Sequence, residues 1–129
     1  MEATKKMGIW MDYSMAHLME FTSNPFEIKT VESTSFDTTT IYPINTLPIL
    51  LEKRKRLLFS YYNKIAREIN NYDRIILFGP TNAKIEFFDV LSEDERFLKT
   101  KVEITNTDQM NPAEQHQFIQ NYFSYKQYD

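Results

Sequence analysis

Residues 49–84 constrain the fold more than any other stretch, because they combine a long amphipathic helix with a buried strand. At 100° per residue, apolar side chains gather within about 60° of one another on the helical wheel: Leu51, Leu58, Tyr62, Ile65 and Ile69. The opposite side collects Lys53, Arg56, Ser60, Lys64 and Arg67. We therefore predict a helix over about residues 50–70 that packs its apolar side on a sheet and exposes its basic side to water.

The segment after this helix predicts a buried strand and a second helix. Ile75-Ile76-Leu77-Phe78 is a short apolar run without alternation, which is typical of a strand covered on both faces. Gly79-Pro80 ends it. A helix is then expected over about residues 82–91, with Ile85, Phe88 and Leu91 facing inward.

Three strands are predicted before the long helix and one after the second helix. Residues 7–12 and 16–21 flank a turn, and residues 26–33 alternate apolar and polar. The short turns between them allow only antiparallel pairing. The irregular connection 34–48 follows. Residues 101–105 form the last strand, and Asn111-Pro112-Ala113-Glu114 predicts a helix start, with Asn at the N-cap and Glu at N3.

The element order is therefore β-β-β-α-β-α-β-α, which predicts an α/β fold with three layers and a five-stranded mixed sheet. Strands one to three should be antiparallel, and right-handed crossovers should make strands four and five parallel to strand one. This order is the one seen in ribonuclease H-like folds. A chain of 129 residues fits a single domain over residues 1–129.

The distribution of charge is uneven and favours one local basic surface. The whole chain carries a net charge of −3, which argues against a general polyanion binder, but residues 49–84 contain 8 basic and 3 acidic groups, a net charge of +5. Phosphates of RNA are the natural partners of such a patch. The candidate RNA-binding residues are Lys53, Arg54, Arg56, Lys64 and Arg67, with Lys55 beside them. An ordinary solvated helix face is the alternative.

The turn between the buried strand and the second helix is a candidate anion site. A helix N-terminus presents free N–H groups and a favourable dipole, and Lys84 lies nearby. The candidate residues are Gly79, Thr81, Asn82 and Lys84. The spacing of a phosphate-binding loop is absent, so a simple strand-to-helix turn is the alternative.

Few residues favour catalysis or a bound metal. Asp12 ends the first strand, where ribonuclease H-like nucleases bind metal, but the end of strand four offers no carboxylate partner. His17 and His116 lack ligand spacing. We therefore expect a turn residue at Asp12, no cofactor and no enzymatic activity.

Two further expectations concern environment and assembly. The chain has no cysteine, so a reducing cytoplasm is expected, and no apolar run is long enough to span a membrane. The C-terminal segment carries several aromatic residues that a homodimer contact or the chain's own sheet could bury: Tyr122, Phe123, Tyr125 and Tyr128.

Four motifs occur in the same order as in a family of proteins. They are Gly8-Ile9-Trp10-Met11-Asp12 with Ala16, Glu52-Lys53-Arg54, Leu77-Phe78-Gly79-Pro80 with Ala83-Lys84, and Thr107-Asp108-Gln109-Met110. Over nearly its whole length the sequence resembles small bacterial proteins that are similar to the central domain of archaeal and eukaryotic class I peptide-chain release factors and of Pelota. The resemblance implies a ribonuclease H-like fold and a place among the components of the translational machinery.

The sequence departs from this family at informative positions. Release factors carry a Gly-Gly-Gln loop before the long basic helix, whereas the connection 34–48 has no glycine here. Peptide-release chemistry is therefore not implied, and Pelota-type domains also lack that tripeptide. The bacterial proteins typically have a second glycine after Gly-Pro and a histidine after the first strand's Asp, where this chain has Thr81 and Tyr13.

The residues and the resemblance together predict a non-catalytic, translation-related binding protein. Its expected partner is the ribosome or structured RNA, contacted through the basic helix 50–70. A protein-interaction module without nucleic acid is the first alternative, because the total charge is acidic. A metal-dependent ribonuclease H-like nuclease is the second, and the missing carboxylate argues against it.

Overall fold

The computed structural model describes residues 4–21, 27–34 and 44–126. Five strands and three α-helices follow the predicted order along these ranges. The elements are β1 (Lys6–Met11), β2 (Met15–Glu20), β3 (Lys29–Glu32), a 3-10 turn η1 (Ile44–Thr46), α1 (Leu47–Glu68), β4 (Arg74–Gly79), α2 (Ala83–Ser92), a 3-10 turn η2 (Glu95–Phe97), β5 (Lys101–Asn106) and α3 (Pro112–Lys126).

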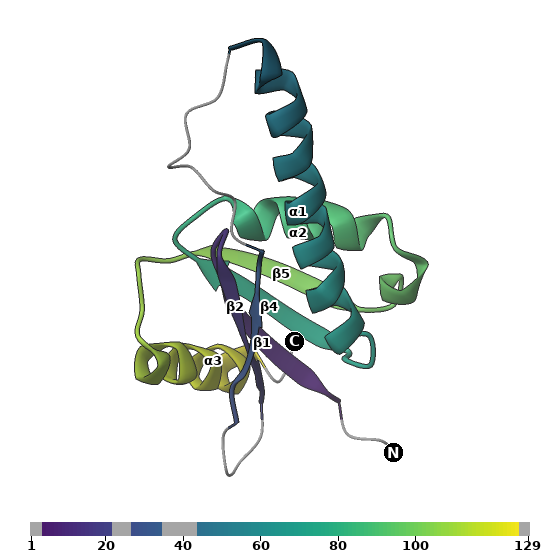
Figure 1. The fold of residues 1–129 in the computed structure, drawn as a ribbon. Coiled ribbons are helices and arrows are strands. Elements are labelled where there is room, and N and C mark those ends of the chain that lie inside the picture. The colour runs from purple at the N-terminus through teal and green to yellow at the C-terminus, as the bar shows by residue number, and fades with distance from the viewer. Residues whose placement is uncertain (1–3, 22–26, 35–43, 127–129) are drawn as a thin grey trace.

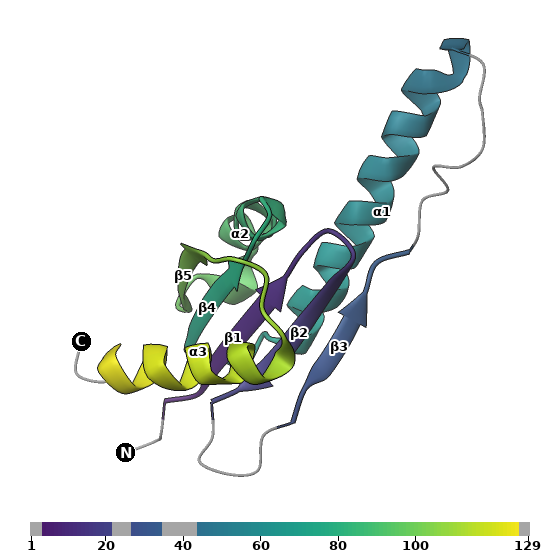
Figure 2. The same cartoon turned by 90° about the vertical axis from the view of Figure 1, so that its left-hand side faces the viewer.

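The strands form one sheet in the order β3-β2-β1-β4-β5. β1 pairs antiparallel with β2, and β2 pairs antiparallel with β3. β4 runs parallel to β1, and β5 runs parallel to β4. Helices α1 and α2 cover one face of the sheet and α3 covers the other (Figures 1 and 2). The predicted three-layer, ribonuclease H-like arrangement is confirmed.

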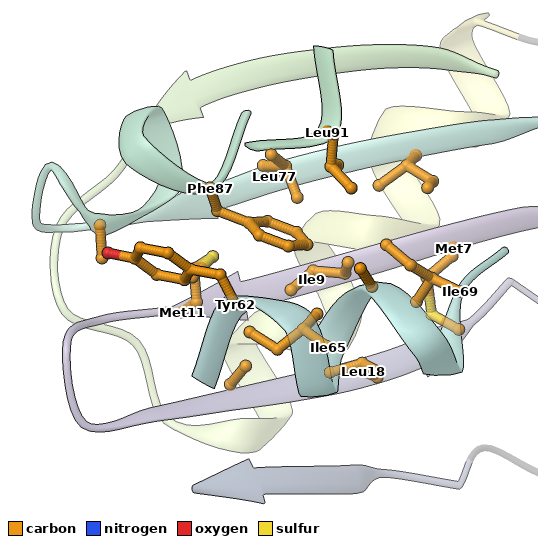
Figure 3. Packing of buried hydrophobic residues seen from close by; sticks show 14 of the residues in the cluster. Met7, Ile9, Met11, Leu18, Tyr62, Ile65, Ile69, Leu77, Phe87 and Leu91 are labelled. Carbon is orange, nitrogen blue, oxygen red and sulfur yellow. The ribbon is translucent and has the colours of Figure 1, made fainter. Parts of the chain in front are cut away.

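Alternation along the central strands divides the core into two layers. In β1, Met7, Ile9 and Met11 face α1 and α2, whereas Trp10 faces α3. The larger layer packs Ile65 of α1 and Phe87 of α2 against these strands (Figure 3). Both side chains are fully buried. β1 and β4 are therefore covered on both faces, as their apolar sequences predict.

Gly8 allows α3 to lie close to the sheet. A Cβ atom at this position would stand 2.3 Å from the Ile119 side chain of α3. Gly79 is required for another reason, because its φ of 143° is rarely adopted by L-residues. A Cβ there would also meet the Met11 carbonyl oxygen at 2.2 Å. Both glycines of the chain thus serve close backbone packing in the centre of the fold.

The predicted start of α3 is confirmed in detail. The Asn111 Oδ1 atom accepts a hydrogen bond from the Glu114 N–H at 2.9 Å. In return, Glu114 Oε1 accepts from the Asn111 N–H at 3.0 Å. This reciprocal pair is a capping box, with asparagine in the place of serine or threonine.

Three expectations about helices need correction. α1 begins at Leu47, before the predicted start, because Pro48 is tolerated in a first helical turn where its missing N–H is not needed. Leu51 does not pack on the sheet and is 50% exposed. In α2 the inward side carries Ala83, Phe87 and Leu91, so the expected inward position of Ile85 is wrong.

Candidate nucleic-acid interface

Helix α1 is longer than the sheet on which it packs. Its 22 residues span about 33 Å at 1.5 Å per residue. Strands of six residues, such as β1 and β4, span only about 20 Å. The first half of α1 consequently extends past the ends of the strands, as both views show (Figures 1 and 2). We call residues 47–59 the projecting half and residues 60–68 the packed half.

The projecting half carries most of the basic residues that the sequence singles out. Lys53, Arg54, Lys55 and Arg56 follow one another and are all exposed. The Lys55 Nζ atom lies 3.8 Å from Glu52 Oε1. An exposed ion pair of this kind contributes little to the free energy of unfolding. The other two predicted cations are in the packed half, where Arg67 is exposed and Lys64 is half-buried.

The structure divides these cations between two sides of the helix. Arg54 lines an apolar groove of about 760 Å³ between α1 and the β1–β2 turn. Leucine side chains supply much of its α1 wall: Leu47, Leu50, Leu51, Leu57 and Leu58. Arg56 and Arg67 instead line a groove on another side, together with Lys55 and with Arg96 of η2. Arg54 therefore lies on a different side of α1 from Arg56 and Arg67.

Where the packed half begins, tyrosines fasten α1 to the sheet and to α2. Glu86 of α2 accepts hydrogen bonds from the hydroxyls of Tyr62 and Tyr13, both at 2.9 Å. The Tyr61 hydroxyl donates to the Asp12 carbonyl oxygen at 2.9 Å. Burial raises the pKa of Tyr62, and the hydrogen bond to Glu86 raises it further. Burial likewise raises the pKa of Tyr61.

Asp12 lies in the β1–β2 turn, as predicted. Its Oδ1 atom accepts from the Ser14 N–H and hydroxyl, both at 2.8 Å, and from the Met15 N–H at 2.9 Å. Such bonds are typical of a turn-forming aspartate. Within the described ranges, no three His, Asp or Glu side chains lie close enough together to hold a metal ion.

The four candidate anion-binding residues come together at the start of α2, but Lys84 is occupied by protein partners. The Lys84 side chain is fully buried. Its Nζ atom donates to the Thr81 carbonyl oxygen and, at 2.9 Å, to Asn106 Oδ1. Desolvation lowers the pKa of this ammonium. Lys84 thus ties α2 to the end of β5, while an anion site at Gly79, Thr81 and Asn82 stays a prediction.

The two histidines lie on different elements. His17 of β2 places Nδ1 2.8 Å from Gln115 Oε1 and stacks on Trp10, with ring centroids 5.3 Å apart. Gln115 also donates to the Met110 carbonyl oxygen at 2.8 Å. These contacts fix α3 on the sheet. His116 lies on α3 itself.

The C-terminal aromatic residues are partly used within the chain. Phe123 is buried, and Tyr122 packs edge-on against it with ring centroids 5.2 Å apart. The side chain of Tyr125 and all of Tyr128 lie outside the described residues. A homodimer contact through this segment therefore stays a prediction. None of the helices in the described ranges is long and apolar enough to cross a membrane.

Sequence reasoning missed Phe59 and Arg96. Phe59 lies on the same side of α1 as Arg56 and is 57% exposed. Helical spacing places Phe59 on one side of α1 with Arg56, Asn63 and Arg67, so the sequence contains a signal for this part of the site. Arg96 had none, because only the fold brings η2 beside α1.

No protein-family model matches the sequence, and no curated protein sequence matches it. Solved structures do share the fold. Pelota of Thermoplasma acidophilum gives a TM-score of 0.61 at 17% identity, covering 95% of this chain and 34% of that one. Archaeoglobus fulgidus Pelota gives 0.60 at 9% identity, covering 97% and 32%. The archaeal translation termination factor aRF1 gives 0.53 at 14% identity, covering 95% and 39%.

The chain spans about a third of the length of the two Pelota proteins. At these identities the likeness shows the fold alone. It confirms, at the level of the fold, the predicted resemblance to release factors and Pelota.

Proposed function

We propose that this protein binds the ribosome through the basic side of α1 and catalyses no reaction itself. The observation that carries the proposal is the projecting half of α1, which extends past the ends of the strands and exposes Lys53 and Arg56 of the basic side, with Arg54 and Lys55 beside them. A rigid helix with clustered lysine and arginine side chains suits a surface of RNA phosphates.

The fold supports a role in translation. One protein with this fold is a translation termination factor, and termination takes place on the ribosome. The present chain lacks a Gly-Gly-Gln sequence, so the role we propose is binding without peptide release. The bonds that hold Asp12 in its turn favour a structural role for this carboxylate over metal-dependent nuclease chemistry.

A protein-interaction module is the second candidate, and the apolar groove favours it. Leu47 and Leu51 are 49% and 50% exposed where they line this groove. Exposed apolar surface of this kind marks interaction sites in many proteins. A protein partner would bind there largely independently of salt, which separates it from an RNA partner.

Sedimentation with ribosomes at two salt concentrations tests the proposal. The wild-type protein should associate at about 50 mM salt and much less at about 200 mM. Replacing Lys53 and Arg56 together by glutamine should weaken association and flatten the salt dependence by about 2 units of log affinity against log salt. The matched control replaces Lys99 and Lys101 by glutamine, which changes net charge equally at exposed positions outside α1.

Association by the control variant should stay at the wild-type level. If both double variants lose association equally, only net charge matters and the α1 surface is not the site. If the wild-type protein does not sediment with ribosomes at about 50 mM salt, the ribosome proposal fails and the protein-interaction candidate replaces it.

A further inference from the structure

The groove on the Arg56 side of α1 combines cations with an exposed aromatic ring. It has a volume of about 710 Å³ and lies between α1 and η2. Its lining residues are Lys55, Arg56, Phe59, Ser60, Asn63, Arg67 and Arg96. Four of these seven are cations, and Phe59, at 57% exposure, is the one aromatic residue among them.

Arg96 is held in place before any ligand arrives. Asp94 accepts from the Arg96 Nη2 atom at 2.7 Å and from its Nε atom at 3.1 Å. The same carboxylate accepts the Arg96 backbone N–H at 2.9 Å, which fixes the η2 turn. A guanidinium has five N–H donors, so donors remain for a further acceptor. Ordering it in advance reduces the entropy lost on binding.

The surface beyond Phe59 is acidic. An adjoining groove shares Phe59, Asn63 and Arg96, and its other lining residues include Asp89, Glu93, Asp94 and Glu95. Phe59 therefore stands at the border between a basic and an acidic surface. A phosphate is favoured only on the α1 side of this border, whereas a neutral flat group can lie on the ring itself.

These features match the two parts of a nucleotide. Its phosphates are anionic, and its base has a flat face that stacks on aromatic side chains. In a duplex the base faces are covered by their neighbours, so only an unpaired segment offers both parts together. An acidic peptide would use the cations but has no general need of the ring.

We propose that this groove binds a single-stranded RNA segment, stacking one base on Phe59 while neighbouring phosphates contact Lys55, Arg56, Arg67 and Arg96. The inference rests on the proposed function, since it gives the basic side of α1 a defined RNA partner. It goes further by assigning roles to Phe59 and Arg96 and by selecting unpaired over paired RNA.

Fluorescence anisotropy with a short labelled RNA, single-stranded or annealed to its complement, tests the inference at about 50 mM salt. Phe59→Ala should weaken binding of the single strand roughly fivefold to a hundredfold and leave duplex binding nearly unchanged. Phe59→Tyr should retain binding, because it keeps a stacking ring. Phe59→Leu should not, because it keeps only apolar bulk.

Ile49→Ala is the matched control, since Ile49 is an exposed apolar residue of the same helix that does not line the groove. It should bind both RNA forms as the wild type does. Thermal unfolding of each variant checks that the fold is intact, which is expected because Phe59 is largely exposed.

The outcomes separate the inference from the proposed function. If Phe59→Ala binds the single strand normally while Arg56→Gln with Arg67→Gln weakens both RNA forms, the groove assignment is overturned and ribosome binding through charge stands. If the wild type binds neither form, the groove assignment fails, and sedimentation with ribosomes decides the proposed function separately. If polyglutamate binds with the same dependence on Phe59, the groove is a site for acidic proteins and the RNA inference is overturned.

Discussion

Both halves of α1 carry an apolar stripe and basic residues, but their surroundings are very different. In the packed half, Tyr61, Tyr62, Ile65 and Ala66 are buried against the sheet and α2. In the projecting half no residue is buried. The apolar stripe nevertheless runs on through Leu51, which is 50% exposed. Hydrophobic periodicity thus shows which side of a helix is apolar, but not how far the sheet beneath it reaches.

The difference assigns separate tasks to the two halves. The packed half stabilises the fold by burying side chains. Because it is already helical, the projecting half can extend the helix without the cost of a new nucleation step. The projecting half consists largely of good helix formers, Leu, Glu, Lys and Arg, so it extends the helix with little help from packing. Most of its side chains are exposed and can contact a partner, although Leu58 still packs against the core.

The largest expected effect is on the free energy of unfolding, when one side chain of the apolar stripe is truncated in each half of α1. Ile65→Ala should lower the free energy of unfolding by about 2–5 kcal/mol, because Ile65 is fully buried between α1, the sheet and α2. Leu51→Ala should lower it by about 0.5 kcal/mol or less. Urea unfolding followed by circular dichroism measures both. An equal loss for the two variants would mean that the projecting half is covered in solution.

Much of this fold could be predicted from the sequence. The order of strands followed from short turns between the first three and helices between the rest, and the α3 capping box followed from Asn111 and Glu114. Local chemistry determines such features. In α2 the predicted inward position was confirmed for Leu91 and wrong for Ile85, because apolar residues occupy two overlapping stripes there and only the sheet selects the one through Phe87.

The candidate site was predictable only in part. The sequence predicts the basic character of α1, and helical periodicity alone places Arg54 and Arg56 on different sides of the helix. Which groove each of them lines depends on the neighbouring elements. Arg96 joins the groove through tertiary structure alone. The place of Lys84 near a helix N-terminus predicts an anion site, whereas its burial against Asn106 depends on where β5 ends. Sequence reasoning therefore identified charged residues more reliably than their neighbours.

A second effect should appear at high pH and arise from buried tyrosines of the packed half and from Tyr72, which follows it in the chain. Burial raises the pKa of Tyr61 and Tyr62 in the folded protein, and burial with the Glu20 carboxylate raises that of Tyr72 to about 12. In the unfolded chain tyrosine titrates near pH 10. Above that pH the unfolded state loses protons that the folded state retains. The free energy of unfolding therefore has its full value below about pH 10 and falls as the pH rises.

The free energy of unfolding should fall by at most about 1.4 kcal/mol per pH unit for each such tyrosine. Urea unfolding at several pH values between about 9 and 11.5 measures it around the unfolded pKa. Tyr62→Phe removes one titrating group, so its slope should be shallower than that of the wild type by one proton. An unchanged slope would show that Tyr62 does not stay protonated in the folded state.

The smallest expected effect compares one substitution at two positions on the basic side of α1. Glycine costs a helix about 0.5–1 kcal/mol relative to good helix formers. Lys64→Gly lies in the packed half, where the helix cannot unwind without losing the core, so the cost should appear in the free energy of global unfolding. Lys53→Gly lies in the projecting half, where local unwinding exposes no buried residue.

Lys53→Gly should therefore leave global stability almost unchanged and increase amide hydrogen exchange in residues 49–57 roughly twofold to fivefold, as a local cost of this size implies. Exchange in residues 61–68 should stay at the wild-type rate. Hydrogen exchange followed by mass spectrometry, with urea unfolding of both variants, distinguishes the two cases. If Lys53→Gly lowers global stability as much as Lys64→Gly, the two halves unfold as one unit, because only a cooperative helix transmits a local loss to the core.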